Sequence, residues 1–91
     1  MNIIDQIRGG ELDEVDLLEH VTDNDVNIAI AVAESKMATF PILDVAAHDK
    51  EKRVRLAAVN NPNIGEETLK YLLYDNDDEI VAIAKNRLER S

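Results

Sequence analysis

Hydrophobic residues recur along this chain at helical spacing, in short blocks separated by polar turns. Residues 2–8 carry three isoleucines on one face, and Gly9-Gly10 then ends the pattern. A second amphipathic block begins near Glu11, and after a polar turn at 22–25 a nearly continuous apolar block covers Val26–Lys36. Spacings of i, i+3 and i+4 within these blocks predict a short helix followed by a helix, a turn and a second helix.

The same order of blocks recurs every 26 residues without a gap. Leu17, Leu43 and Leu69 occupy one column of this self-alignment, and the clearest copy of the unit is Val54–Tyr74. A fixed period of this length is typical of stacked helical repeats. We predict a single domain over 1–91, with an N-terminal capping helix at 1–10 and repeats at about 11–42, 43–68 and 69–91.

Acidic side chains recur at the turns between the paired helices. Asp23, Asp49 and Asp75 share one column, which indicates turn and capping residues repeated with the fold. A calcium loop starting at the last of these turns is excluded, because an EF-hand needs glycine at its sixth position and glutamate at its twelfth. The chain has Ile80 and Asn86 at those positions.

The run Val54–Val81, VRLAAVNNPNIGEETLKYLLYDNDDEIV, resembles the leucine-rich repeat variant, a helical repeat related in shape to HEAT and armadillo repeats. The residues that carry the resemblance are Val54-Arg55, Asn61-Pro62-Asn63, Leu69 and Asp75-Asn76-Asp77. The resemblance implies an all-α, armadillo-type fold, a short right-handed α-solenoid of about three helical hairpins. It implies no activity, because such repeats serve unrelated scaffolding roles. Asn63, with Glu66 three residues on, is also expected to start a capping box-like helix end.

The formal charge of −9 changes the functional picture more than the composition does. Residues 1–42 hold 9 acidic and 2 basic residues, and the rest of the chain is close to balanced. Such acidity argues against nucleic acids and anionic membranes as partners. The absence of cysteine excludes disulfides and thiolate chemistry. We find no secretory signal and no apolar run long enough to span a bilayer, so a cytoplasmic location is expected.

No catalytic or metal-binding constellation is visible, and we expect no cofactor and no enzymatic activity. His20 shares its column with Ala46 and Leu72, a core position, which favours a packed or hydrogen-bonded histidine over a metal ligand. His48 lies beside a turn and is expected to be exposed. The hydroxyl residues have no histidine at a suggestive spacing, and there is no phosphate-binding glycine loop.

One surface carries a binding hypothesis. On the second helix of each unit, positions 28, 31, 32 and 35 are expected to face the core and positions 26, 29, 30 and 33 to face outward. This places Ile30, Leu56, Val59 and Val81 in an apolar track across the repeats, beside a basic cluster that includes Arg53 and Arg55. Exposed contiguous apolar surface tends to mark an interaction site. Alternatively, repeat curvature or the N-terminal helix covers the track.

The sequence therefore predicts a non-catalytic protein-interaction or scaffold module. An acidic protein or peptide would suit the basic cluster, and Ile30, Arg53, Arg55, Leu56, Val59 and Val81 are the candidate contact residues. The alternative is a structural homo-oligomer, such as a homodimer, that uses the same face. A HEAT-like nucleic-acid or enzyme module is less favoured, because it would call for a basic groove with stacking aromatics and the chain has three aromatic residues.

Overall fold

The computed structural model describes residues 2–90, which are helical with short connections and contain no strand. The helices are α1 (Ile3–Arg8), α2 (Glu14–His20), α3 (Val26–Glu34), α4 (Phe40–Ala47), α5 (Lys52–Asn60), α6 (Glu66–Leu72) and α7 (Asp78–Glu89). The all-α prediction is therefore confirmed. None of these helices combines the length and apolar character needed to cross a bilayer.

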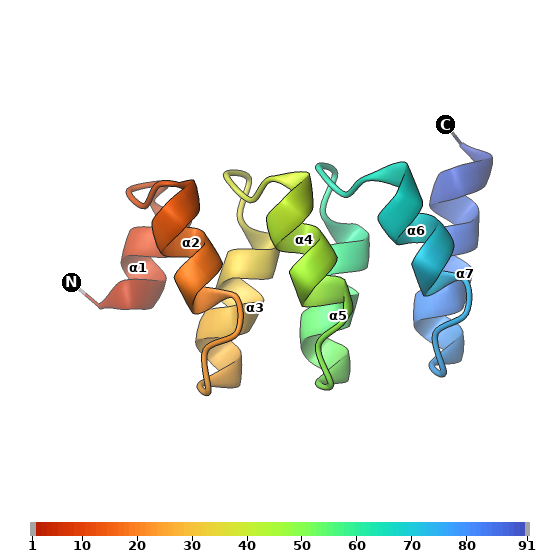
Figure 1. Cartoon of the computed structure of the whole chain (residues 1–91), viewed down its shortest axis with the longest axis horizontal. Coiled ribbons are helices and arrows are strands. Elements are labelled where there is room, and N and C mark those ends of the chain that lie inside the picture. Colours follow the sequence, from red (N-terminus) through yellow and green to blue (C-terminus); the bar gives the residue numbers. More distant parts are fainter. Residues whose placement is uncertain (1, 91) are drawn as a thin grey trace.

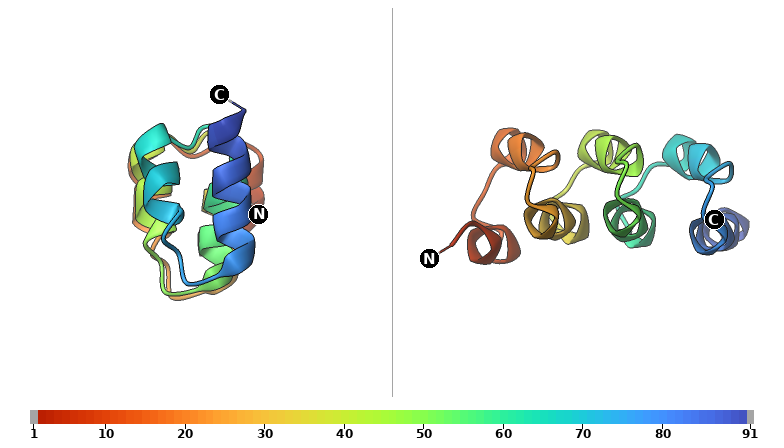
Figure 2. Two further views of the ribbon diagram at one scale, coloured as in Figure 1. Left: turned by 90° about the vertical axis from the view of Figure 1, so that its right-hand side faces the viewer. Right: turned by 90° about the horizontal axis from the view of Figure 1, so that it is seen from below.

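The helices form two rows along the longest dimension of the molecule. Helices α1, α3, α5 and α7 make one row and α2, α4 and α6 the other (Figure 1; right panel of Figure 2). Seen end-on, the hairpins α2–α3, α4–α5 and α6–α7 lie nearly over one another (left panel of Figure 2). The molecule measures 39 × 24 × 16 Å along its principal axes. Helices α2 to α7 therefore have neighbours in their own row as well as in the opposite row, whereas the main neighbour of α1 is α3.

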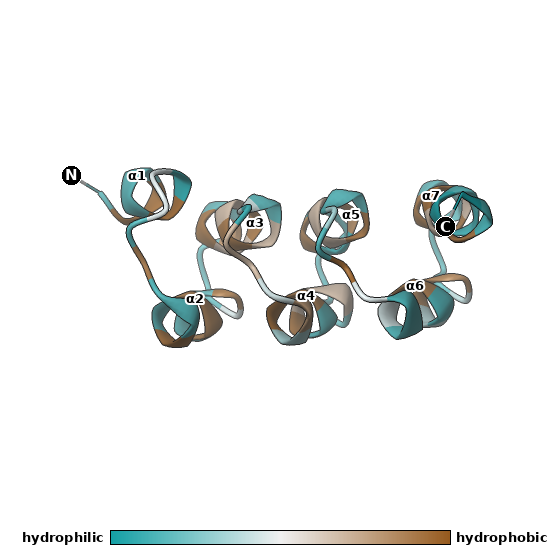
Figure 3. Cartoon of the chain, turned by 90° about the horizontal axis from the view of Figure 1, so that it is seen from above, coloured by the Kyte–Doolittle hydropathy of each residue, from teal (hydrophilic) through white to brown (hydrophobic). Residues whose placement is uncertain are grey.

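The core lies between the two rows and receives buried residues from every helix, and Figure 3 shows hydrophobic stretches on helices of both rows. Leu17, Leu43 and Leu69, the column that defines the 26-residue spacing, are all buried. Val32 and Ile80 reach the same core from the other row and are fully buried. Aliphatic and alanine side chains fill this space because the helices pack closely.

The acidic turns recur with the same geometry in every hairpin. The carboxylates of Asp23, Asp49 and Asp75 each accept the backbone N–H two residues further on, at 2.8, 2.8 and 2.9 Å. Asp25 and Asp77 then cap α3 and α7 through their own side chains. The predicted role of these acidic columns as turn and capping residues is confirmed at these positions. At α5 the capping position is Glu51, whose side chain makes no capping bond.

Neighbouring hairpins are tied together at the end of the second helix. The side-chain amide of Asn61 donates to the backbone oxygens of Ala33 and Ser35, at 2.9 and 2.8 Å. One period later, Arg87 Nη1 donates to the oxygens of Val59 and Asn61, both at 2.8 Å. We call each such pair of bonds a carbonyl bridge. The bridges satisfy carbonyl groups that a helix end leaves without an intrahelical partner.

The predicted capping role of Asn63 is wrong. Gly65 occupies the N-cap of α6 and, without a side chain, makes no side-chain capping bond. The amide of Asn63 instead donates to the backbone oxygens of Lys36 and Ala38, both at 2.9 Å. The residue therefore ties the loop before α6 to the loop before α4, a long-range role that local spacing does not reveal.

Helix α1 is held differently from the others. Gly9 ends it and Gly10, at φ +71°, turns the chain toward α2, as the Gly-Gly pair predicts. Ile7 is buried, and two further isoleucines of α1 pack against the core. Within residues 2–90, no side-chain hydrogen bond or ion pair joins α1 to another helix. Its attachment to the molecule is therefore apolar.

Candidate functional site

The predicted apolar track is not a continuous exposed surface in the structure. Val59 is 0% exposed, and Ala29 and Ala33, which were also expected to face outward, are buried. The prediction assumed that the second helix of each hairpin is covered only by helices of the opposite row. In fact α3 packs on both α1 and α5, and α5 packs on both α3 and α7. These flanking contacts enclose more of each helix, so Val59 cannot contribute to a binding surface.

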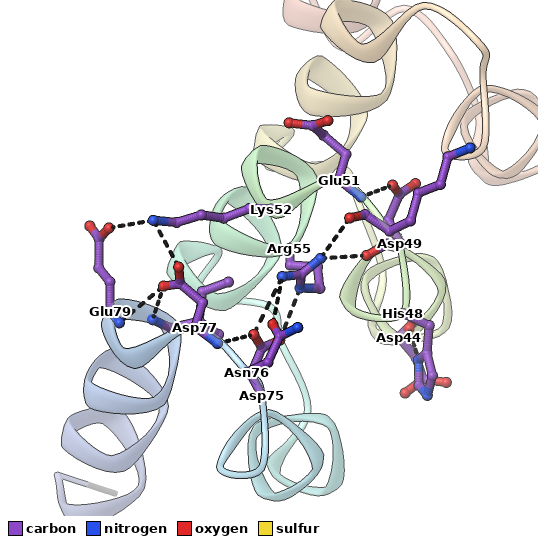
Figure 4. A network of polar contacts seen from close by, with 12 residues as sticks. Asp44, His48, Asp49, Glu51, Lys52, Arg55, Asp75, Asn76, Asp77 and Glu79 are labelled. Carbon is purple, nitrogen blue, oxygen red and sulfur yellow. Dashed lines mark hydrogen bonds and ion pairs between the residues drawn. The ribbon is translucent and has the colours of Figure 1, made fainter.

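Arg55 is a structural residue in this fold. Its side chain is only 13% exposed, and its Nε donates to Asp75, 6% exposed, at 2.9 Å. Its Nη1 donates to the backbone oxygens of Asp49 and Lys50, at 2.9 and 3.0 Å (Figure 4). The guanidinium therefore joins the acidic turn of one hairpin to that of the next. Nearby, Lys52 forms a separate tie to the start of α7.

A different line of apolar residues crosses the row of α1, α3, α5 and α7, beside the predicted track. Ile4, Ile30, Leu56 and Ala82 lie 26 residues apart on α1, α3, α5 and α7, and each keeps part of its surface exposed. Two of the predicted contact residues, Ile30 and Leu56, belong to this line. Val81, which is only partly exposed, lies beside it in the same column as Arg55. We call this four-residue line the apolar line.

Three grooves lie between successive helices of this row, and residues of the apolar line contribute to two of them, the α3–α5 and the α5–α7 groove. The central groove, between α3 and α5, has a volume of about 440 Å³, and Ile30, Leu56 and Ala57 supply its apolar surface. Its other lining residues are Glu34, Arg53, Asn60, Asn61 and Pro62. The groove between α1 and α3 measures about 430 Å³, and the one between α5 and α7 about 560 Å³. The row thus presents one grooved face.

The charged residues that line the grooves are mostly basic, although the molecule as a whole is acidic. The charged residues that line the three grooves are Arg8, Glu34, Lys36, Arg53, Arg87 and Arg90. Five of these six are cationic, whereas the whole chain has 19 acidic and 10 basic residues. Half of the lysine and arginine residues are therefore concentrated on one face.

Two carboxylates near the grooves are perturbed by basic neighbours. Arg53 Nε donates to Glu51 at 2.9 Å, and this hydrogen bond lowers the pKa of Glu51. The ammonium of Lys52 lies 3.0 Å from Asp77 and 3.3 Å from Glu79. The hydrogen bond from Lys52 lowers the pKa of Asp77, and the bonds to Asp77 and Glu79 raise the pKa of Lys52. The Lys52 ion pairs join the start of α5 to the start of α7.

The two histidines lie apart and contact ordinary structural partners. His20 is partly buried and its Nδ1 lies 3.2 Å from Asp23, in agreement with a hydrogen-bonded structural histidine. His48 is exposed, as predicted, and its ring stacks on Tyr71 with centroids 4.0 Å apart. Its Nδ1 lies 2.7 Å from the backbone oxygen of Asp44, which can only accept, so Nδ1 carries the hydrogen. Residues 2–90 hold no group of three or more potential metal ligands.

A second exposed set escaped the sequence prediction. All three aromatic residues are exposed: Phe40 at 65%, Tyr71 at 47% and Tyr74 at 89%. They belong to α4, α6 and the turn after α6, in the row opposite the grooves. A signal was present, because the column of Phe40 contains Glu14 and Glu66, and polar residues in a column indicate an exposed position.

No family model, no curated protein and no solved structure matches the chain.

Proposed function

We propose that this chain is a short α-solenoid of the leucine-rich repeat variant or HEAT-like type that binds an acidic protein segment and catalyses no reaction. The observation that carries the proposal is the charge of the grooved face. A strongly acidic chain places five of its ten basic residues along three adjacent grooves, two of which are also lined by residues of the apolar line. Charge complementarity of this kind steers partners and sets their orientation.

The central groove supplies the anchor in this proposal. Ile30 and Leu56 offer apolar surface to one large apolar side chain of the partner, and burial of such a side chain contributes about 1.5–3 kcal/mol. Arg53 is well exposed at the rim and can pair with a partner carboxylate. Asn60 uses its amide N–H on its own helix and leaves its side-chain oxygen to accept from a partner backbone.

A nucleic-acid partner fits these features less well. The net charge of −9 opposes the approach of a polyanion, and phosphate neutralisation dominates nucleic-acid affinity. Single-stranded nucleic acids also stack on aromatic side chains. The aromatic residues of this chain belong to α4, α6 and the following turn, away from the helices that line the grooves.

The test is a selection of displayed random peptides on the immobilised protein, followed by anisotropy measurements with the enriched peptides. We expect enriched sequences to combine aspartate or glutamate with one large apolar residue, and their affinity to fall with added salt. Enrichment of basic sequences, or of none, would refute the proposal.

Matched variants locate the binding surface. Leu56→Asp and Arg53→Glu should abolish binding. Lys70→Glu, which makes the same charge change as Arg53→Glu but on α6, should leave binding intact. Because Leu56 is partly buried, its variant is checked by circular dichroism, and the exposed Arg53 gives an independent reading. Equal binding to Arg53→Glu and to the parent protein would also refute the proposal.

Light scattering behind a sizing column addresses the homo-oligomer alternative. We expect a monomer, because two copies of the grooved face would bring like charges together. The α7 end is also charged, since Lys85 and Arg90 are exposed in columns where the preceding hairpins bury Val59 and Ile64. A further copy stacked on this end would have to bury both charges without partners, which is costly. A dimer that Leu56→Asp dissociates would instead favour the homo-oligomer.

A further inference from the structure

The guanidinium of Arg87 has more hydrogen-bond donors than its carbonyl bridge uses. In its carbonyl bridge it donates from Nη1 alone to two backbone oxygens. One period earlier, the neutral amide of Asn61 makes the equivalent two bonds. The greater length of arginine is explained by α7, which continues to Glu89, whereas α5 has ended at Asn60. The positive charge of Arg87 suits the last turn of α7, where cations interact favourably with the helix dipole, but its remaining N–H groups have no such explanation.

The unused donors of this region face the same groove. Within residues 2–90, Arg87 Nε and Nη2 and the whole guanidinium of Arg90 have no hydrogen-bond acceptor or ion-pair partner. The side-chain amide of Asn86 has none either among these residues. All three residues line the groove between α5 and α7, together with Asn60, Ala82 and Ile83.

This groove is the most suitable of the three for a negative charge. Its lining contains two guanidinium groups and two amides and no acidic residue, around a volume of about 560 Å³. The grooves on either side of α3 both include Glu34. The carbonyl bridge also fixes the guanidinium of Arg87, so less side-chain entropy is lost when a ligand binds.

We propose that the α5–α7 groove is an anion-binding subsite in which Arg87 and Arg90 bind a carboxylate or a phosphate group of the partner segment. Guanidinium groups match both anions through paired, charge-assisted hydrogen bonds. Asn86 donates a further N–H, and Ala82 and Ile83 contact the apolar part of the side chain that carries the anion. The inference rests on the proposed function for the identity of the partner, but the subsite can be tested without one.

The experiment is a titration of the ¹⁵N-labelled protein with inorganic phosphate in one arm and acetate in the other, at constant ionic strength set with sodium chloride. We expect saturable shifts of the Arg87 and Arg90 Nε–H signals and of the Asn86 side-chain amide. Saturation by phosphate alone assigns a phosphate subsite, and saturation by acetate as well assigns a carboxylate subsite. Linear shifts in both arms would overturn the proposal.

Three single variants with the same change in net charge make the test specific. Arg90→Gln should weaken anion binding about tenfold, the factor expected for loss of one charged hydrogen-bond partner. Arg87→Gln removes the other guanidinium of the groove and should weaken binding similarly. Lys85→Gln, on the same helix but outside the groove lining, should leave binding unchanged.

An equal effect of all three variants would show attraction to general charge and overturn the subsite. The outcome is separable from that of the proposed function. Peptide binding that survives Arg90→Gln but is lost in Arg53→Glu would retain the proposed function and refute the subsite. Saturable anion binding without any selected peptide would retain the subsite and refute the proposed function.

Discussion

Replacing Asn61 by alanine should destabilise the protein far more than the small size of the asparagine side chain suggests. The side chain belongs to a residue that is 3% exposed, and its amide donates to the oxygens of Ala33 and Ser35 at 2.9 and 2.8 Å. Its oxygen also accepts the backbone N–H of Asn63 at 2.9 Å. Asn61→Ala therefore removes three hydrogen bonds and leaves the carbonyl bridge without its donor.

The expected magnitude follows from the groups left unpaired. Each lost hydrogen bond costs about 1 kcal/mol net, and a buried acceptor left unsatisfied costs more. Three bonds give a loss of about 3 kcal/mol, out of a total stability of roughly 5–14 kcal/mol for a chain of this length. With a urea dependence of about 1 kcal/mol per molar, the unfolding midpoint should fall by about 3 M.

The assay is equilibrium urea unfolding followed by circular dichroism at 222 nm, with Asn60→Ala as the matched control. Asn60 is the preceding residue, is exposed, and bonds only the backbone oxygen of Leu56 on its own helix, at 3.0 Å. Its replacement should cost less than about 0.5 kcal/mol, as is usual for surface sites. The reasoning is refuted if Asn61→Ala costs under about 1 kcal/mol, or if both variants cost the same.

Three further predictions concern the ties between hairpins. Arg55→Leu should cost about 3 kcal/mol in urea unfolding because it leaves a buried carboxylate unpaired, and a cost below about 1 kcal/mol would contradict this. Ala29 occupies the column of Arg55 and lines, with Asp49, a groove of about 360 Å³. Ala29→Arg should therefore raise the thermal midpoint, whereas a decrease would show overpacking. The pKa of Asp77 is lowered and that of Lys52 is raised by their shared hydrogen bond, so the pair stabilises the fold above the ordinary carboxyl value of 3.8 and below the ordinary ammonium value of 10.5. The difference in unfolding free energy between the parent and Lys52→Met should disappear as the pH falls below 3.8 or rises above 10.5. A difference that does not depend on pH would exclude this ion pair as its source.

Local periodicity predicts the parts of this fold that depend on a residue and its near neighbours. The buried leucine column at Leu17, Leu43 and Leu69 and the acidic turns could be predicted because helix faces and turn capping involve residues a few positions apart. The 26-residue spacing then places the same contacts in each hairpin.

The parts that were missed depend on neighbours remote in the chain. Val59 follows the outward pattern of a helix covered on one side, but α7 covers it from a second side. Asn63 has the spacing of a local cap, yet its partners are Lys36 and Ala38. In the sequence Arg55 has the pattern of a solvent-exposed basic residue, but in the structure it donates to Asp75 in the turn of the next hairpin. For the candidate site, only Ile30, Arg53 and Leu56 of the predicted set line the central groove.

Because α1 is attached only by apolar contacts, local unfolding of the molecule should begin at this helix. The hairpins α4–α5 and α6–α7 are tied to each other by the side chains of Arg55, Lys52, Thr68 and Arg87, whereas α1 has no comparable tie within residues 2–90. Opening free energies differ among cooperative units of one protein. We expect the amides of α1 to exchange with solvent first and those of α5 and α7 last. Ile4 belongs to α1, so transient detachment of this helix would shorten the apolar line and make its length a property of the native-state ensemble.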